Sequence, residues 1–314
     1  MTAEGALPAT RGKRVALVLG AGGARGLAHI GVIEALEARG FEIAAIAGSS
    51  MGALVGGIHA AGKLAAYRDW ADRLERNDVL RLLDVTFGAS GLIRGDRVIA
   101  TLRDLVGEHR IEGLPIPYVA VATDLATQRE VWFQQGPLFD AIRASIAIPM
   151  VFTPHEVNGR ELVDGGLLAP LPLAATRGFH CDYVVAVDLN ARSPRAPTSE
   201  PVPLREAEMF NDDAPAAPSG WKTRVASWFN APPPPVGATP AAPAGGIASL
   251  LDLMSRSMDT MHSQMTRLQV AQDPPDLVIR VPRDAASFYE FWRAKELRER
   301  GRELAEDALS AWVQ

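Results

Sequence analysis

The sequence is poor in three features that define large classes of proteins: cysteine, basic tracts and long uncharged runs. A single cysteine among 314 residues excludes a disulfide framework and fits a reducing compartment. A net charge of −5 without any basic tract gives no indication of nucleic-acid binding. No uncharged run approaches the ~20 residues of a membrane span, and no apolar segment follows Met1–Lys13 as in a secretory signal. We therefore expect a soluble, cytoplasmic protein, at most in peripheral contact with membranes.

What is present is an ordinary globular composition, with 47% hydrophobic and 22% charged residues. A chain of this length can bury a full core in one large domain or two small ones. The lone cysteine, Cys181, lies in the apolar run that continues to Val185. Free cysteines in such runs are usually buried, so we expect it in the core and not in a catalytic role.

The first part of the chain has the pattern strand, glycine loop, helix, strand. Residues 14–19 form a short apolar run that ends in glycines, as a buried parallel strand does. Residues 28–38 have helical spacing and stop before Gly40, and residues 42–47 are a second strand that ends at Gly48. A small-residue helix follows from Gly52, which predicts very close packing. The loops after both strands should leave the same end of a parallel sheet.

Alternating strands and helices continue along the chain and predict an α/β fold with a mainly parallel sheet. The further strands that we expect cover residues 117–123, 130–133, 160–163, 182–188 and 276–281, and the further helices cover 97–106, 138–145, 246–271 and 287–312.

A proline-rich region interrupts this order. Between Pro194 and Pro243 lie 12 of the 23 prolines, which predicts a flexible or extended insertion at about 194–245. Within it, Trp221, Val225, Trp228 and Phe229 share one face of a short helix. Such a helix either docks on the body of the protein or rests at a lipid interface through Trp221, Trp228 and Phe229.

The segment Gly48-Ser49-Ser50-Met51-Gly52 matches G-x-S-x-G between a predicted strand and a predicted helix. In a nucleophile elbow the serine occupies a strained turn, so the flanking positions, here Gly48 and Gly52, need residues without side chains. Its hydroxyl then stands at the N-terminus of the next helix, where the dipole favours negative charge. Ser50 is therefore the candidate nucleophile; the alternative is an idle serine in a glycine turn.

The loop Gly20-Ala21-Gly22-Gly23-Ala24-Arg25-Gly26 follows the first strand and presents backbone N–H groups in one direction. It could hold a dinucleotide pyrophosphate or an oxyanion. The dinucleotide pattern needs glycine at the position of Arg25 and an acidic residue at the end of the second strand. That strand ends instead at Gly48, directly before Ser50, so the oxyanion interpretation is favoured.

A proton acceptor is best supplied by Asp164, which an apolar strand delivers into the glycine pair Gly165-Gly166. A lone Asp-Gly is often just a turn, but this is one of three glycine-marked loops at strand ends. Asp124 is the fallback carboxylate. The six histidines are scattered, although a Ser-Asp-His order stays open through His180 or His262.

These loops, in this order and spacing, resemble the patatin-like phospholipase family, and within it the bacterial RssA-like group related to the neuropathy target esterase catalytic domain. The resemblance covers roughly residues 14–190 and, more loosely, 247–310, without the proline-rich insertion. The matching segments are residues 19–31, 47–57, 91–95, 141–145 with Ile148-Pro149, and 162–166.

The resemblance implies a three-layer α/β/α sandwich over residues 14–314, as a single domain after a flexible N-terminus of residues 1–13. It implies a lipid acyl ester substrate and no cofactor or metal. In the implied dyad, Ser50 attacks the ester carbonyl and Asp164 accepts its proton directly. Ala21 stands where many members have glycine, which we expect to shift the loop. The resemblance places the oxyanion at the backbone N–H groups around Gly22, Gly23, Ala24 and Arg25.

Three other functions remain open from the sequence. The fold could serve as a lipid-binding or regulatory module with vestigial hydrolysis. It could transfer the acyl group to an acceptor other than water, because the same residues would do so. A nucleotide-binding α/β protein is a third hypothesis, against which the missing acidic residue argues.

Overall fold

The computed structural model describes residues 12–82, 84, 93–192 and 247–312. The chain divides into two compact units, residues 1–192 with 258–314, and residues 193–257. Only residues 247–257 of the second unit are described. The expected flexible N-terminus, apart from its last two residues, lies outside the described residues. The whole proline-rich insertion at about 194–245 also lies outside them, and with it the aromatic positions Trp221, Trp228 and Phe229. The single domain therefore stays a prediction.

The first unit is built on an eight-stranded sheet with the order β5-β6-β3-β2-β1-β7-β8, to which β4 adds by pairing with β3. The five strands from β3 to β8 along this order run parallel, whereas β4 and β6 pair antiparallel with β3, and β5 with β6. The strands are β1 Arg14–Leu19, β2 Glu42–Ser49, β3 Tyr118–Asp124, β4 Arg129–Phe133, β5 His155–Val157, β6 Arg160–Asp164, β7 Tyr183–Ala191 and β8 Leu277–Pro282.

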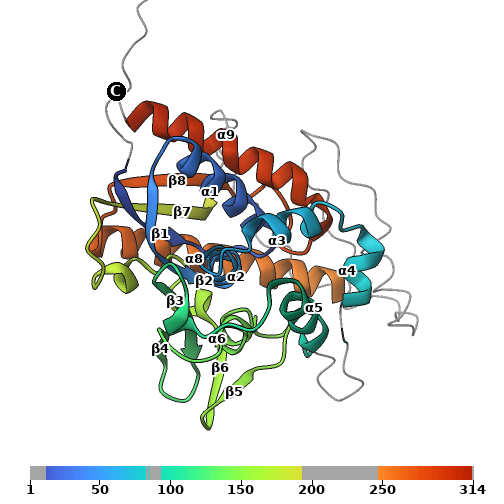
Figure 1. Ribbon diagram of the computed structural model, residues 1–314. Helices are drawn as coiled ribbons and strands as arrows, with labels where there is room; N and C mark the ends of the chain where they lie inside the picture. Colours follow the sequence, from blue (N-terminus) through green and yellow to red (C-terminus); the bar gives the residue numbers. More distant parts are fainter. Residues whose placement is uncertain (1–11, 83, 85–92, 193–246, 313–314) are drawn as a thin grey trace, which may run out of the picture. The chain divides into compact units, whose positions relative to one another are not determined.

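Helices and 3-10 turns surround this sheet, and Figure 1 shows α1 and α9 side by side. The α-helices are α1 Ala28–Ala38, α2 Met51–Ala60, α3 Leu64–Ala71, α4 Arg76–Leu82, α5 Asp96–Val106, α6 Leu138–Ser145, α8 Ile247–Gln272 and α9 Ala294–Trp312. The 3-10 segments are η1 Gly23–Leu27, η2 Ile111–Gly113, η3 Gly165–Leu167, η4 Leu173–Thr176 and η5 Phe291–Arg293.

The two faces of the sheet are covered by different layers. Along β1, Leu17 belongs to the large core shared with α1, α2 and α9, and Val18 points the other way. On that second face, Val18 packs with Leu171 and Leu173, and Val270 of α8 packs against the same cluster. Successive side chains of a strand point to opposite faces, so an apolar run without alternation is buried on both. The predicted α/β fold with helices flanking a mainly parallel sheet is confirmed.

The structure differs from the expected local structure in three respects. The helix expected from residue 287 begins at Ala294, after a turn in which Glu290 Oε2 accepts the Ser287 amide at 2.9 Å, and after η5. The short elements α3, α4 and β5 were not expected. Cys181, expected in the core, is partly exposed, because β7 begins only at Tyr183 and the cysteine lies in the loop before it.

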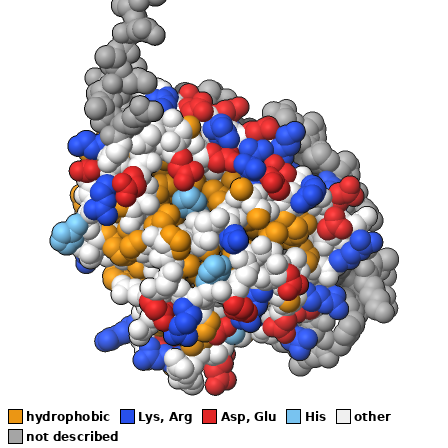
Figure 2. Space-filling model, in the orientation of Figure 1, with side chains coloured by type: hydrophobic (Ala, Val, Ile, Leu, Met, Phe, Trp, Pro, Cys, Tyr) orange, Lys and Arg blue, Asp and Glu red, His pale blue; other side chains and the backbone are white. Residues whose placement is uncertain are grey.

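The surface of the described residues combines both charge signs with apolar groups. Figure 2 shows hydrophobic side chains gathered across the middle of one face, with acidic and basic side chains intermixed around them. Apolar atoms ordinarily make up much of a protein surface. Within the described ranges, no helix is both long and apolar enough to cross a bilayer.

Candidate active site

Ser50 occupies the sharp turn between β2 and α2. Its backbone has φ 55° and ψ −126°, in the left-handed half of φ that a residue with a side chain rarely adopts. The turn is possible because its flanks are glycines: a Cβ on Gly52 would overlap the carbonyl oxygen of Leu19, and one on Gly48 would overlap the backbone of Gly52. The predicted close packing of the small-residue helix is therefore confirmed at its first turn.

The register of β3 explains how Ser50 and Asp164 meet, although 114 residues separate them. Ser49, the last residue of β2, pairs with Val121, and Asp164, the last residue of β6, pairs with Ala122. Because β2 runs parallel to β3 and β6 runs antiparallel to it, the two strands approach from opposite ends of β3. They end beside the consecutive β3 residues Val121 and Ala122. The Ser50 hydroxyl donates a hydrogen bond of 2.6 Å to Asp164 Oδ2.

Asp164 is held in a buried, weakly polar environment. Its Oδ1 accepts the Gly166 amide at 2.7 Å, and its residue surface is 3% exposed. Burial raises the pKa of this carboxyl from 3.8 to about 7, against the opposing effect of the hydrogen bonds from Ser50 and Gly166. A carboxylate of this pKa can accept a proton near neutral pH and return it. The pair can therefore activate a hydroxyl and later protonate a leaving group.

Ser145, a residue of α6 that was not predicted to have a role, supports the turn at Ser50. The Ser50 amide donates to Ser145 Oγ at 2.9 Å, and the Ser145 hydroxyl donates to the Val121 carbonyl at 2.6 Å. Ser145 is fully buried. The only signal available was its place in the segment 141–145, which belongs to the family resemblance. This hydroxyl joins the turn at Ser50 to β3.

Substitution Ser145→Ala leaves the buried Ser50 amide without its acceptor and removes one donor from the Val121 carbonyl. We expect the free energy of unfolding to fall by about 1–3 kcal/mol, the usual cost of such an orphaned group. Urea unfolding followed by tryptophan fluorescence measures the loss, with Ser310→Ala, an exposed serine on α9, as the control. An unfolding free energy equal to that of the wild type would show that the link does not stabilise the turn.

The backbone amides of the glycine loop have different partners. Ala21 donates to the Pro170 carbonyl and Ala24 to the Phe288 carbonyl, both at 2.8 Å. Among the described residues, the amides of Gly22 and Gly23 have no hydrogen-bond acceptor. Of the four positions expected around an oxyanion, Ala24 therefore has its backbone donor engaged, whereas Gly22 and Gly23 have backbone donors free for one.

The side chain of Arg25 anchors this loop to its surroundings. It is buried, and it donates to the Gly22 carbonyl at 3.1 Å and pairs with Asp259 Oδ1 at 2.7 Å. His29 holds the start of the loop, because its Nε2 donates to the Gly20 carbonyl at 2.9 Å. Burial lowers the pKa of His29 to about 4, so it is neutral at physiological pH. Both contacts stiffen the backbone that presents the free amides.

The other candidates lie elsewhere or have other partners. The fallback residue Asp124 caps a turn, since its Oδ1 accepts the amides of Ala126 and Thr127 at 2.9 and 3.0 Å. His180 is exposed, whereas His262 of α8 packs near Gly166. Within the described part of the chain, no group of three acidic, histidine or cysteine side chains is placed to hold a metal ion.

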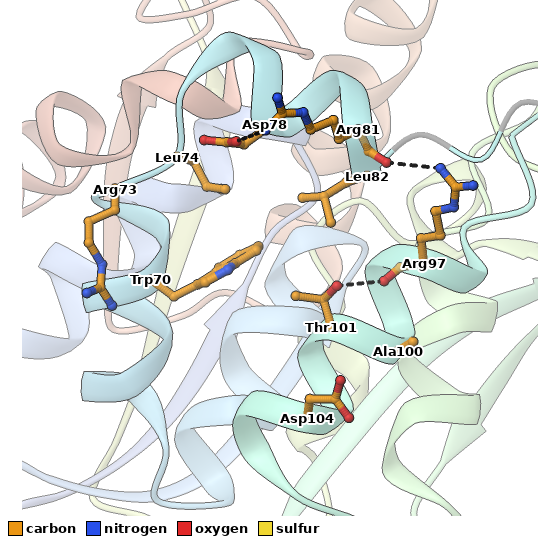
Figure 3. A pocket seen from close by; sticks show the side chains of 10 residues that line it. All are labelled: Trp70, Arg73, Leu74, Asp78, Arg81, Leu82, Arg97, Ala100, Thr101 and Asp104. Carbon is orange, nitrogen blue, oxygen red and sulfur yellow. Dashed lines mark hydrogen bonds and ion pairs between the residues drawn. The ribbon is translucent and has the colours of Figure 1, made fainter.

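A cavity of about 620 Å³ lies between α3, α4 and α5. Trp70, Leu74 and Leu82 supply apolar walls, and Arg73, Arg81 and Arg97 are among its charged residues (Figure 3). Its lining includes neither Ser50 nor Asp164 nor any residue of the glycine loop. The cavity is therefore separate from the Ser50–Asp164 pair.

Comparison with known proteins relates these features to one family. The family model described as patatin-like phospholipase matches residues 17–177, which include the glycine loop, Ser50 and Asp164. The chain belongs to the patatin-like phospholipase family. The predicted resemblance to this family is thereby confirmed, and family membership implies a lipid hydrolase.

Relatives of this family member range from close to distant. Uncharacterized NTE family protein Rv1063c of Mycobacterium tuberculosis is 45% identical over 332 residues, covering 95% of this chain and 92% of that protein. Lysophospholipase NTE1 of Saccharomyces cerevisiae is 32% identical over 192 residues, covering 59% of this chain but 11% of that protein. Among solved structures, VipD from Legionella pneumophila matches with a TM-score of 0.39 and 14% identity, covering 96% of this chain and 67% of that chain.

Proposed function

We propose that this protein hydrolyses acyl esters of lipids, of the phospholipase or lysophospholipase type, with Ser50 as nucleophile and Asp164 as its base. One observation carries the proposal: the Ser50 hydroxyl donates at 2.6 Å to a buried carboxyl whose pKa is raised to about 7. The similarity to a yeast protein named a lysophospholipase supports the substrate class.

In the first half of the reaction, Asp164 takes the proton of Ser50 as Oγ bonds to the ester carbonyl carbon. The resulting oxyanion accepts hydrogen bonds from the amides of Gly22 and Gly23. Preorganised donors of this kind each contribute about 2.7–4 kcal/mol to transition-state stabilisation. The tetrahedral intermediate then collapses, the carbon–oxygen bond to the alcohol breaks, and Asp164 gives its proton to the departing alcohol oxygen.

In the second half, a water molecule attacks the acyl-enzyme as Ser50 attacked the ester. Asp164 takes a proton from water as its oxygen bonds to the acyl carbon, and the same amides hold the oxyanion. Collapse releases the fatty acid, and Ser50 Oγ recovers the proton from Asp164. A pKa near 7 suits both directions of transfer, because the protonated and the ionised forms of the carboxyl are both populated at neutral pH.

The decisive experiment is turnover of a panel of lipid esters by the wild type and by Ser50→Ala, with Ser310→Ala as the matched control. We expect Ser310→Ala to retain wild-type rates and Ser50→Ala to fall to the uncatalysed background, because the nucleophile is lost. A fluorophosphonate probe should label the folded wild type and not Ser50→Ala. Wild-type rates in the Ser50→Ala variant would refute the proposal, and failure of the probe to label the folded wild type would favour a lipid-binding role.

A further inference from the structure

A polar face of α8 lies against the glycine loop and against the turn at Gly166. This face comprises Asp259, His262, Thr266 and Gln269, spaced three and four residues apart and therefore on one side of the helix. At one end, Asp259 Oδ1 pairs with the buried Arg25 of the glycine loop at 2.7 Å. At the other end, Gln269 Oε1 accepts the Leu171 amide at 3.0 Å. Between these anchors lies His262.

The imidazole of His262 faces the same space as the carboxyl of Asp164. A Cβ built on Gly166 would lie 3.2 Å from His262 Nε2, 2.9 Å from Asp164 Oδ1 and 2.9 Å from the Ala21 Cβ. A methyl group does not fit at this position, so the absence of a side chain at Gly166 lets the imidazole, the carboxyl and the glycine loop approach it from three sides. His262 is therefore close to the proposed base, whereas from the sequence it was a candidate only for a catalytic triad.

Both ring nitrogens of His262 are out of contact with solvent and have no hydrogen-bond partner among the described residues. Burial lowers the pKa of this imidazole to about 4; nearby Asp259 raises it and Arg25 lowers it. The ring is therefore neutral at physiological pH and offers one N–H donor and one acceptor. Buried polar atoms in proteins nearly always have a partner, so two unpaired nitrogens, of which Nε2 lies beside Gly166, point to a ligand.

The chemistry of Asp164 indicates which part of the substrate would come near. Its Oδ2 faces Ser50, and the same carboxyl must protonate the departing alcohol oxygen. We propose that the alcohol part of the ester lies on the Asp164 side of Ser50, toward Gly166 and His262. There His262 binds an oxygen of this alcohol part, and so favours esters of alcohols that carry further hydroxyl or phosphate oxygens, such as glycerol. This proposal rests on the proposed hydrolase function.

Two esters with the same acyl chain test the proposal: a monodecanoylglycerol, which has free hydroxyls on the alcohol part, and p-nitrophenyl decanoate, whose alcohol part has no hydroxyl or phosphate. We expect His262→Leu to lower kcat/KM for the glycerol ester about tenfold, mainly through KM, the loss of about one hydrogen bond to substrate. The p-nitrophenyl ester and fluorophosphonate labelling of Ser50 should stay near wild type. His262→Gln, which restores a donor and an acceptor, should recover most of the loss.

The control is Gln264→Leu, an exposed residue of the same helix, which should change neither substrate. An equal loss for both esters in His262→Leu would show that the imidazole only supports the fold, and no loss for either would show that it touches no substrate. Full loss of the glycerol ester in both His262→Leu and His262→Gln, with the p-nitrophenyl ester also lost, would likewise overturn the proposal. A folded wild type that hydrolyses neither ester defeats the proposed function itself, and this inference with it.

Discussion

Asp164→Asn is expected to lower kcat by about 10²- to 10⁴-fold, the usual contribution of a positioned general base. The amide has nearly the shape of the carboxyl and can still accept the Gly166 amide, so the turn should be retained. It cannot take the proton of Ser50. The loss should appear in kcat for every ester, because acylation and deacylation in the proposed mechanism both use the same carboxyl. An activity of Asp164→Asn equal to that of the wild type would exclude Asp164 as the base.

The same substitution is expected to stabilise the fold at alkaline pH. In the folded protein the pKa of Asp164 rises from 3.8 to about 7, so the folded state binds this proton more tightly than the unfolded state. The Asp164 proton therefore contributes its full stabilisation of the folded wild type below about pH 4. This contribution decreases as the pH rises and is lost above about pH 7. At about 1.4 kcal/mol per pKa unit, the cost amounts to a few kcal/mol. An asparagine, which stays neutral, avoids it.

Urea unfolding at pH 5 and pH 8 measures this effect, with Asp307→Asn, an exposed carboxyl of α9, as the control. The difference in unfolding free energy between Asp164→Asn and the wild type should favour the variant and be larger at pH 8 than at pH 5. The control should show little change. In parallel, kcat/KM of the wild type should rise with pH through about 7, as the carboxyl becomes able to accept a proton. A variant less stable than the wild type at pH 8 would contradict the burial argument.

Gly52→Ala is expected to reduce the free energy of unfolding by about 3 kcal/mol or more, at the upper end of overpacking effects. The added methyl would overlap the carbonyl of Leu19, which ends the central strand β1. A backbone carbonyl in a strand cannot rotate away as a flexible side chain can. Relief therefore requires α2 to move from the sheet, and this movement displaces Ser50 as well.

Circular dichroism during urea unfolding gives the stability, and hydrolysis of a p-nitrophenyl ester gives the activity of the fraction that folds. The control is Gly178→Ala, because a Cβ at Gly178 meets no atom within 4 Å. We expect Gly178→Ala to stay near wild type in both measurements. Wild-type stability in Gly52→Ala would mean that the contact between α2 and β1 yields more readily than this geometry indicates.

Local sequence patterns determined much of the fold. The apolar run of β1, the helical spacing of α1 and the small residues of α2 are short-range signals, and each fixes an element within a few residues. The serine turn was readable for the same reason, because a strand, two glycines and a helix are consecutive in the chain. Short elements such as α3, α4 and β5 gave no such signal, since their conformation depends on neighbours supplied by the rest of the fold.

The candidate site shows where local patterns stop being sufficient. Asp164 and Asp124 both follow apolar strands, and only the antiparallel placement of β6 against β3 brings Asp164 to Ser50. Burial by the surrounding elements, and not any neighbour in sequence, raises the pKa of Asp164. The role of Ser145 could not be predicted, because its hydrogen bond to the Ser50 amide joins residues 95 positions apart.

The sequence by itself therefore determined the fold class, the family and the serine turn, because these depend on residues that are adjacent in the chain. Tertiary structure supplied the contact by which Asp164, already the first candidate from the sequence, faces Ser50. It alone decided which amides of the glycine loop stay free, and that α8 brings His262 beside Gly166. These contacts join segments far apart in the chain. Their geometry and desolvation arise only when the sheet and its covering helices are assembled, and no local pattern encodes them.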